Sequence, residues 1–324
     1  MRELILSTES WEMKIPFRIT GHVFTEARVL HVKILENGCQ GRGEASGIYY
    51  LDETPDSMHA QAESVRQALE QGADREALRE LLPAGGARNA IDCALWDLEA
   101  KLSGRSIWDL TGIQPRETIT VNTVGIDTIP KMAAAARALD TPRIKVKLDG
   151  EMPLERITAV REARPDAEIV VDVNQGWVFD QLVDLAPRFG ALGVAMIEQP
   201  LPRGGDAELE GYEPPIPLCA DESCLHTKEF DQASRRYQMI NIKLDKTGGL
   251  TEALDLAALA QAHGIGLMVG NMVGTSLAMA PGYVIAQLCR FVDLDGALFL
   301  KQDRKHPMVC HGGVIEPPSP ALWG

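Results

Sequence analysis

Between residues 143 and 293, apolar segments end in a polar residue or a glycine at a nearly constant interval of 22–27 residues. A strand, a helix and two connecting loops need about that length, so each interval corresponds to one βα unit. The carboxyl ends of successive parallel strands meet at the mouth of a (β/α) barrel, where barrel enzymes place their chemistry. The sequence therefore predicts an α/β fold whose strand ends carry Lys147, Asp172, Glu198, Asp221, Lys243, Gly270 and Asp293.

The first 115 residues lack this alternation. An antiparallel sheet followed by helices predicts a separate α+β domain over residues 1–115. Its expected elements are strands over residues 3–8, 28–36 and 38–44, loops over 17–24 and 45–50, and helices over 54–70, from 74 onward and over 87–103. Asn37-Gly38 predicts a hairpin turn between the last two strands, and Thr54-Pro55 predicts the cap of the first helix.

The remainder of the chain is predicted to form a barrel domain over residues 116–304. A tail of about 305–324 is rich in glycine and proline, cannot form a barrel helix, and is expected to return to the first domain. The expected strands lie near residues 119, 144, 169, 195, 217, 240, 267 and 292, and the expected helices over 129–139, 153–164, 178–190, 228–235, 251–263 and 276–289.

Composition excludes several classes of partner. The formal net charge is −14 and the sequence pI is about 5.0, which disfavours nucleic acids and anionic membranes as general partners. The six cysteines form no CxxC pair and have no zinc spacing, so buried reduced thiols are expected. The N-terminus lacks a signal sequence and no segment approaches the ~18 apolar residues of a membrane span. We expect a cytoplasmic protein.

Three carboxylates end the third, fourth and fifth predicted barrel strands, which are neighbours in the ring. Asp172, Glu198 and Asp221 would repel one another unless a cation neutralised them. Oxygen ligands without Cys or His favour Mg²⁺ over zinc. Asn174 is expected to orient Asp172. The alternative is that each strand-end acid merely caps the following helix.

Two lysines lie two residues apart in an otherwise buried strand, so Lys145 and Lys147 emerge on one face. Burying both is costly unless the site needs a base or positive charge. Lys147 ends the second strand and Lys243 the sixth, so they face each other across the expected metal, with Glu222 placed to orient Lys243. The charges of Lys145 and the metal would lower a lysine pKa from ~10.4 toward the ~7–8 of a useful base. The catalytic candidates are therefore Lys147, Lys243 and Lys145. Mg²⁺ on a substrate carboxylate would stabilise an enediolate, which implies inversion at the carbon next to that carboxylate.

Asp293 and Asp295 also lie two residues apart, at the eighth strand. Carboxylates that do not bind the metal but open into the same mouth suit a substrate ammonium group. The alternative is a solvated acidic turn.

Six short motifs distributed over almost the whole chain occur together. They are Lys145-Val-Lys147, Asp172-Val-Asn174, Ile197-Glu-Gln-Pro200, Ala220-Asp-Glu-Ser223, the segment Asn241–Gly249 and the segment Ala87–Asp97. In combination they resemble the enolase superfamily, and within it the muconate-lactonising subgroup. The resemblance implies a modified TIM barrel of the (β/α)7β type with an N-terminal α+β capping domain and one Mg²⁺ per active site. Barrels of this kind often associate, so the resemblance is compatible with a homo-oligomer.

The Asp293-Leu-Asp295 element resembles that of dipeptide epimerases of the L-Ala-D/L-Glu type, where the pair holds the N-terminal ammonium of the substrate. The resemblance implies a two-base 1,1-proton transfer that inverts the C-terminal residue of an L,L-dipeptide, in murein peptide recycling or general peptide catabolism. Members acting on Ala-Glu tend to carry an arginine in the first capping loop, whereas residues 20–24 contain none. The substrate-binding candidates here are Thr123, His22 and Phe24. Arg18 is a further candidate to replace the missing arginine, and Phe24 favours an apolar side chain.

Two alternatives use the same scaffold. o-Succinylbenzoate synthase and N-succinylamino acid racemase act on substrates without a free ammonium group, which would leave Asp293 and Asp295 unexplained. A barrel without catalytic activity should have lost at least one of the two base lysines or three carboxylates, and all five are present.

Overall fold

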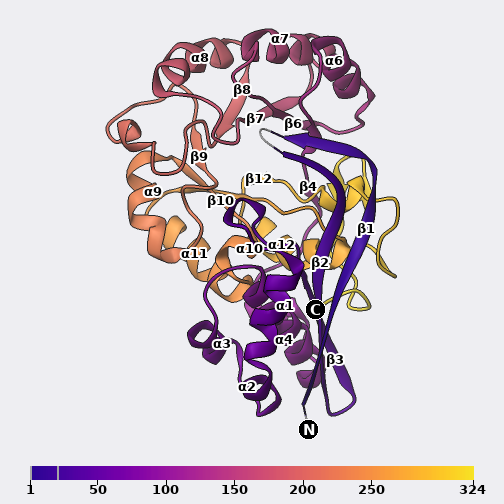
Figure 1. The fold of residues 1–324 in the computed structure, drawn as a ribbon. Coiled ribbons are helices and arrows are strands. Elements are labelled where there is room, and N and C mark those ends of the chain that lie inside the picture. Colours follow the sequence, from indigo (N-terminus) through magenta and orange to yellow (C-terminus); the bar gives the residue numbers. More distant parts are fainter. Residues whose placement is uncertain (1, 20–21) are drawn as a thin grey trace.

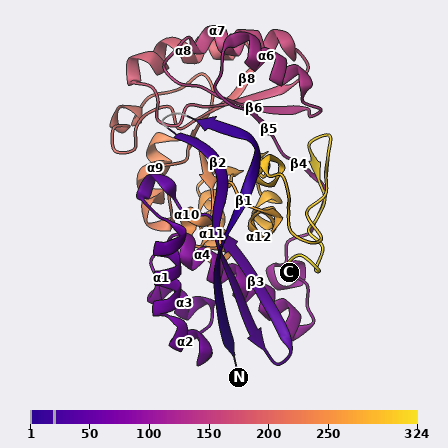
Figure 2. The same cartoon turned by 45° about the vertical axis from the view of Figure 1, so that its right-hand side comes forward.

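The computed structural model describes residues 2–19 and 22–324, without the side chain of His22. An antiparallel domain packs beside an eight-stranded parallel barrel (Figure 1). Helices α1–α4 lie at one end of the molecule, whereas the far end of the long β1–β2 hairpin lies beside the part of the barrel that carries β6–β8. Figure 2 shows the same arrangement from a second direction. The β1–β2 hairpin thus extends from the capping domain to the barrel.

The first sheet has the order β1-β2-β3 and consists of β1 (Glu3–Ile19), β2 (His22–Glu36) and β3 (Cys39–Ala45). Asn37 and Gly38 both have positive φ, 49° and 80°, as a two-residue type I′ hairpin requires, which confirms the predicted turn. The prediction of a loop over residues 17–24 was wrong for the described part. Phe17 pairs with Phe24 across the hairpin, and a register shift between Glu12 and Phe17 lets the ladder continue beyond the predicted end.

The helices of this domain pack on β2 and β3. Thr54 caps α1, as predicted, by accepting from Ser57 N at 3.1 Å. The predicted helix over 54–70 is divided at Val65, whose φ of −106° leaves the helical region. Gly43 lets α4 approach closely, since a Cβ there would lie 2.0 Å from Ala90 O. The helices are α1 (Pro55–Ser64), α2 (Arg66–Glu70), α3 (Arg75–Leu81), α4 (Gly86–Ser103) and α5 (Ile107–Thr111), with a 3₁₀ turn η1 (Tyr49–Leu51).

The barrel strands follow one another in sequence order, which confirms the predicted α/β barrel class. Val121 N donates to Val292 O at 2.8 Å and links the two ends of the sheet. The strands are β5 (Asn122–Val124), β6 (Arg143–Lys147), β7 (Glu168–Asp172), β8 (Val194–Glu198), β9 (Leu218–Ala220), β10 (Met239–Ile242), β11 (Gly266–Val269) and β12 (Phe291–Val292).

Helices cover the outside of the barrel. One connection differs, because β8 and β9 are joined by a segment whose only helix is a 3₁₀ turn, η2 (Ala207–Leu209). The other helices and 3₁₀ turns of this part of the chain are α6 (Ile129–Ala138), α7 (Pro153–Ala163), α8 (Phe179–Ala191), η3 (Thr227–Glu229), α9 (Phe230–Arg236), α10 (Leu244–Thr247), α11 (Leu250–Ala262), α12 (Ser276–Ala286) and η4 (Gly296–Phe299).

The predicted first barrel strand near residue 119 was misplaced. Residues Thr118–Ile119 form β4, which pairs with β14 (Val314–Ile315) in a small sheet with β13 (Cys310–His311). The barrel strand is β5, three residues further on. The alternating Thr and Ile residues suit a strand, but their partner comes from the distant tail and could not be identified from local sequence.

The end of the tail also contacts the first domain. Gly324 N donates to Asp97 Oδ1 at 2.8 Å, and Trp323 Nε1 donates to Cys93 O at 2.9 Å. The domain boundaries at residues 115 and 304 stay predictions. Within the described residues, no helix combines the length and apolar character needed to cross a membrane.

Candidate active site

The strand ladders bring the predicted groups to neighbouring positions. Lys147 is the Cα partner of Asp172, and Asp172 is the partner of Glu198. Glu198 pairs with Cys219, two residues before Asp221. The side chains of all three acids are fully buried. The strand register therefore brings together side chains that are 23–26 residues apart in the chain.

Lys145 lies at the centre of this cluster. Its Nζ is 2.9 Å from Asp172 Oδ2, 2.7 Å from Glu198 Oε2 and 2.7 Å from Asp293 Oδ2. Burial alone would lower the pKa of Lys145, but these carboxylates raise it well above its usual range. Lys145 is thus an ammonium group that bridges the acids and is not poised to act as a base.

Each candidate base is paired with one carboxylate. Lys147 Nζ lies 2.5 Å from Asp172 Oδ2, and Lys243 Nζ lies 2.5 Å from Asp221 Oδ2. Burial opposes the charge of Lys243, yet Asp221 and Glu198 raise its pKa above the usual value. The expected lowering of the pKa is therefore not present at Lys243 in the protein alone, because the carboxylates facing it outweigh the neighbouring lysines.

A buried lysine that the sequence analysis did not single out also holds Asp221. Lys246 Nζ is 2.7 Å from Asp221 Oδ1 and donates to Asp221 O at 2.6 Å and Asn241 O at 2.8 Å. Burial favours the neutral acid, but Lys243 and Lys246 together lower the pKa of Asp221 far below its usual value. The sequence signal for Lys246 was its place within the motif Asn241–Gly249.

The two residues expected to orient these groups behave differently. Asn174 accepts from Lys147 Nζ at 3.0 Å, and its backbone N donates to Asp172 Oδ1 at 3.0 Å. Among the described residues, Glu222 makes no hydrogen bond to Lys243, and its Oε2 has no hydrogen-bond partner. Burial and the charge of Asp221 raise the pKa of Glu222 to about 8. The structure therefore places Asn174, but not Glu222, in contact with the group it was expected to orient.

Asp293 and Asp295 follow β12 and are 6% and 4% exposed, which excludes a solvated acidic turn. Thr123 N donates to Asp295 Oδ2 at 2.9 Å, so the end of β5 reaches this pair. Burial and the charge of Asp293 raise the pKa of Asp295 well above its usual value. A cationic ligand beside the pair would relieve this excess of negative charge.

Aromatic residues from the capping domain flank the same end of the barrel. Phe24 packs edge-on against Tyr49, with ring centroids 5.4 Å apart, and lies 6.4 Å from the ring of Phe17. A hollow of about 180 Å³ between the domains is lined by Phe24, Tyr49 and Met272 among others. Thr20, Gly21 and the side chain of His22 lie outside the described residues, so the proposed contact of His22 stays a prediction.

The three carboxylates have the chemistry of a Mg²⁺ site but do not form a ready cluster of ligands. Within the described part of the chain, no three His, Cys, Asp or Glu side chains surround a common point. Each acid contacts a lysine instead. Burial and the charge of Asp172 raise the pKa of Glu198 to about 7, against the opposing effect of Lys145. Asn241 Nδ2, which the sequence analysis did not single out, donates to Glu198 Oε1 at 2.7 Å. Carboxylate oxygens are the ligands that a hard divalent cation prefers, so the chemistry of this donor set fits Mg²⁺.

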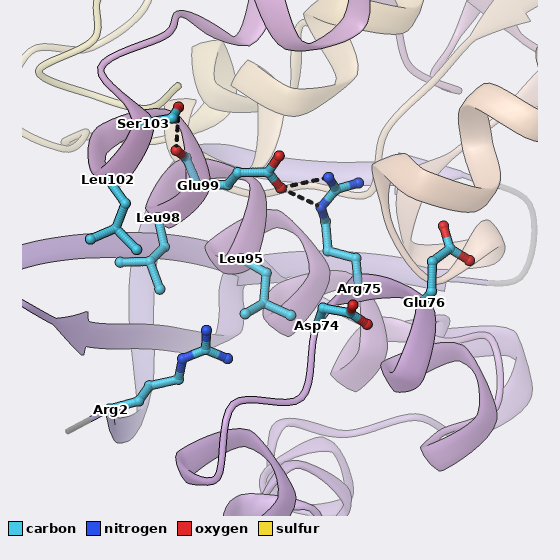
Figure 3. Close-up of a pocket in the computed structure, with 9 residues that line it drawn as sticks. All are labelled: Arg2, Asp74, Arg75, Glu76, Leu95, Leu98, Glu99, Leu102 and Ser103. Carbon is cyan, nitrogen blue, oxygen red and sulfur yellow. Dashed lines mark hydrogen bonds and ion pairs between the residues drawn. The ribbon is translucent and has the colours of Figure 1, made fainter.

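A larger hollow of about 580 Å³ lies on the capping domain (Figure 3). Three leucines of α4 line one side, and Arg75 bonds Glu99 at 2.6 Å while stacking on Trp96. None of the predicted site residues lines this hollow in the described part of the chain. The chemistry therefore concentrates at the barrel mouth.

Comparison with protein families agrees with this architecture. Residues 130–321 match the family described as enolase C-terminal domain-like, and residues 1–112 match the mandelate racemase/muconate lactonizing enzyme N-terminal domain. The chain therefore belongs to the enolase superfamily, as the sequence motifs indicated.

Relatives within the superfamily are racemases and epimerases. The chain is 46% identical over 308 residues to the L-Ala-D/L-Glu epimerase of Escherichia coli K12, covering 94% of this chain and 96% of the relative. It is also 46% identical over 244 residues to an N-acetyl-D-glutamate racemase from Pseudoalteromonas, covering 75% and 78%.

Two similar solved structures contain a bound metal ion and a dipeptide. An enolase family member from Agrobacterium tumefaciens with bound sodium and L-Ala-L-Glu has a TM-score of 0.98 at 39% identity, with both chains covered completely. A dipeptide epimerase from Methylococcus capsulatus complexed with Mg and L-Arg-D-Lys has a TM-score of 0.92 at 31% identity, covering 99% of this chain and 98% of that one.

Proposed function

We propose that this protein is a Mg²⁺-dependent dipeptide epimerase that inverts the α-carbon of the C-terminal residue of an L,L-dipeptide. One observation carries the proposal. Lys147 and Lys243 stand on the second and sixth of eight barrel strands, and between them lie the three buried carboxylates of Asp172, Glu198 and Asp221. Catalysed inversion needs a proton donor and acceptor on opposite faces of one carbon, which this placement supplies.

The two lysines exchange roles within one turnover. The neutral lysine removes the α-proton from one face, and the opposing ammonium returns a proton to the other. The three carboxylates would hold Mg²⁺, which would supply positive charge that stabilises the enediolate. Two of these carboxylates, Asp221 and Glu198, raise the pKa of Lys243 in the protein alone. Lys145 balances the remaining negative charge at Asp172 and Glu198.

The substrate's other end is assigned to Asp293 and Asp295. A dipeptide presents its ammonium group one residue away from the inverted carbon, and a buried pair of carboxylates at the same mouth satisfies it. Thr123 holds Asp295 through its backbone N. This assignment favours a free dipeptide over an N-blocked amino acid.

The side chain at the inverted carbon is glutamate or an apolar group. Glutamate is supported by the E. coli epimerase and by the Agrobacterium complex with L-Ala-L-Glu. An apolar side chain is supported by Phe24, which packs on Tyr49 where an arginine would otherwise pair with glutamate. We place the enzyme in the cytoplasm, in murein peptide recycling or general peptide catabolism, on sequence grounds.

The proposal is tested by incubating L,L-dipeptide libraries with enzyme and Mg²⁺ in D₂O. Removal and return of the α-proton leaves a single deuteron that mass spectrometry detects. Labelling of L-Ala-L-Glu, or only of dipeptides with apolar C-terminal residues, would establish epimerase activity and select the side chain. Absence of label from every dipeptide would refute the proposal.

A second candidate is racemisation of N-acylated glutamate, favoured by the similarity to the N-acetyl-D-glutamate racemase. Such a substrate has no ammonium group to meet Asp293 and Asp295. N-acetyl- and N-succinylglutamate belong in the same D₂O screen. Label in these compounds but in no dipeptide would select this second function.

A further inference from the structure

Gln199 directly follows Glu198 and is completely buried. Its φ is 36°, in the left-handed region that residues other than glycine rarely adopt. Such a conformation costs free energy and persists when surrounding contacts fix it. The two residues after Val173 share this feature, with φ of 45° at Asn174 and 68° at Gln175. Strained backbone is therefore concentrated where β7 and β8 end.

The backbone and side chain of Gln199 connect all three strand ends that carry carboxylates. Its N donates to Cys219 O at 2.9 Å, and its O accepts from Gln175 N at 2.9 Å. Its side-chain Oε1 accepts from Asp221 N at 2.9 Å and Ser223 N at 3.0 Å. The residue next to Glu198 is thus bonded to Asp221 itself and to the segment that follows Asp172.

The amide of Gln199 is held in one orientation. Nε2 lies within hydrogen-bonding distance of Leu201 O at 2.8 Å, Ser223 Oγ at 2.8 Å and Tyr237 Oη at 3.1 Å. Both hydroxyls in turn donate to Asp206 Oδ2, at 2.6 Å and 2.8 Å. With acceptors on one side and two backbone N–H donors on the other, rotating the amide would break every one of its bonds.

We propose that Gln199 is a positioning residue that fixes the spacing of Glu198 and Asp221, and so prepares the carboxylates for a divalent cation. The inference rests on the proposed function in that the cation is the one assigned there. Gln199 touches neither the cation nor the substrate; it acts through the backbone of its neighbours. Removing groups that orient metal ligands typically weakens metal affinity about 10–100-fold.

The test compares Gln199→Leu with Tyr237→Phe in the full chain, using Mn²⁺ as a spectroscopic probe. The first variant loses all side-chain bonds to Asp221 and Ser223. The second loses the bonds of the Tyr237 hydroxyl to Gln199, Asp206 and Ser223 Oγ, but keeps the two bonds from Asp221 N and Ser223 N to Gln199 Oε1. We expect Mn²⁺ affinity, measured by electron paramagnetic resonance, to fall about tenfold or more in Gln199→Leu. Tyr237→Phe should bind as the wild type does, even if its melting temperature falls. Equal affinity in folded Gln199→Leu and wild type would overturn the proposal.

A measurement on the wild type covers the case in which Gln199→Leu does not fold. Hydrogen exchange of the metal-free protein should show the amides of Asp221 and Ser223 protected as strongly as neighbouring barrel amides, because Gln199 Oε1 accepts from both. Rapid exchange at these amides, slowed only after Mn²⁺ is added, would overturn the proposal. Wild-type protein that bound no Mn²⁺ at all would instead contradict the Mg²⁺ dependence of the proposed function.

Discussion

The barrel strand ends and the far end of the capping hairpin place their side chains in different ways. At the strand ends, ladder register sets the neighbours, with Lys147 opposite Asp172 and Asp172 opposite Glu198. In the hairpin, the ring of Phe17 lies 4.6 Å from that of Phe299, which comes from the other domain. Shifting the register by one residue would disperse the charged cluster. A single substitution in the hairpin changes one side-chain contact and leaves the charged cluster in place. The barrel is therefore suited to keep the chemistry, and the hairpin to vary the substrate.

The largest effect that this comparison predicts follows substitution of either base. Lys147→Ala or Lys243→Ala should reduce inversion on the order of a thousandfold or more, because one face of the α-carbon loses its proton carrier. The remaining lysine still serves the opposite face. Proton NMR in D₂O should therefore show α-deuterium entering only one of the two stereoisomers, and the opposite isomer in the other variant.

An exposed lysine provides the control. Lys131 pairs with Asp127 at 3.1 Å on α6, and Lys131→Ala should leave both inversion and exchange unchanged. Exchange into both stereoisomers by each base variant would show that these two lysines are not the two bases.

The next effect concerns a hydrogen bond between the barrel and the capping domain. Asp245, two residues after Lys243, accepts from Gly47 N of the capping domain at 2.8 Å. Burial and the nearby Glu53 raise its pKa to about 6. The folded protein therefore binds this proton more tightly than the unfolded chain, whose Asp titrates near ~3.9. Stability falls as pH rises from about 4 to about 6, by on the order of 3 kcal/mol from this group.

Asp245→Asn removes the titration, so the free energy of unfolding should vary less over that window. Urea unfolding at pH 4 and pH 7 measures it. The exposed Asp255→Asn should keep the wild-type pH dependence, and an unaltered dependence in Asp245→Asn would contradict the assignment.

A smaller effect separates the two candidate substrates. Asp295→Asn keeps an acceptor for Thr123 N but loses the charge, and kcat/KM for dipeptides should fall about 30-fold, the value of one charged hydrogen bond. Turnover of N-acetylglutamate, if present, should not fall. Equal losses for both substrates would mean that Asp295 does not recognise the ammonium group.

The raised pKa of Asp295 gives this prediction a pH signature. Because the ammonium group binds the ionised pair, dipeptide binding should release a proton and strengthen as pH rises through that pKa. Calorimetry in two buffers of different ionisation enthalpy measures the proton count. A proton count of zero at every pH measured would contradict the shift.

The smallest effect lies in the hairpin. Phe24→Arg should raise the preference for L-Ala-L-Glu over L-Ala-L-Leu about tenfold, since an arginine can pair with the glutamate carboxylate. Competition kinetics with both substrates measures the ratio. Phe24→Leu, which adds no charge, should leave the ratio near that of the wild type; a gain there as large as with arginine would exclude charge pairing.

The sequence predicted the barrel strand ends better than it predicted the capping hairpin. The barrel and its charged strand ends were predictable because each βα unit repeats one period, and Asp172 or Glu198 stands at its end. Gln199 and Lys246 escaped prediction because their partners lie on other strands and only packing reveals them. The strand pairing of Phe17 with Phe24 was missed since the hairpin continues past an irregular register.

The contacts of residues 321–324 with β3 and α5 have a consequence for synthesis. Arg42 Nη2 donates to Ala321 O at 2.6 Å, and Gly324 O accepts from Ile107 N at 3.0 Å. A domain whose strands are translated first thus receives part of its packing from residues translated after the whole barrel. On the ribosome the capping domain would wait, incompletely packed, until these residues emerge, so the two domains would reach their final stability together.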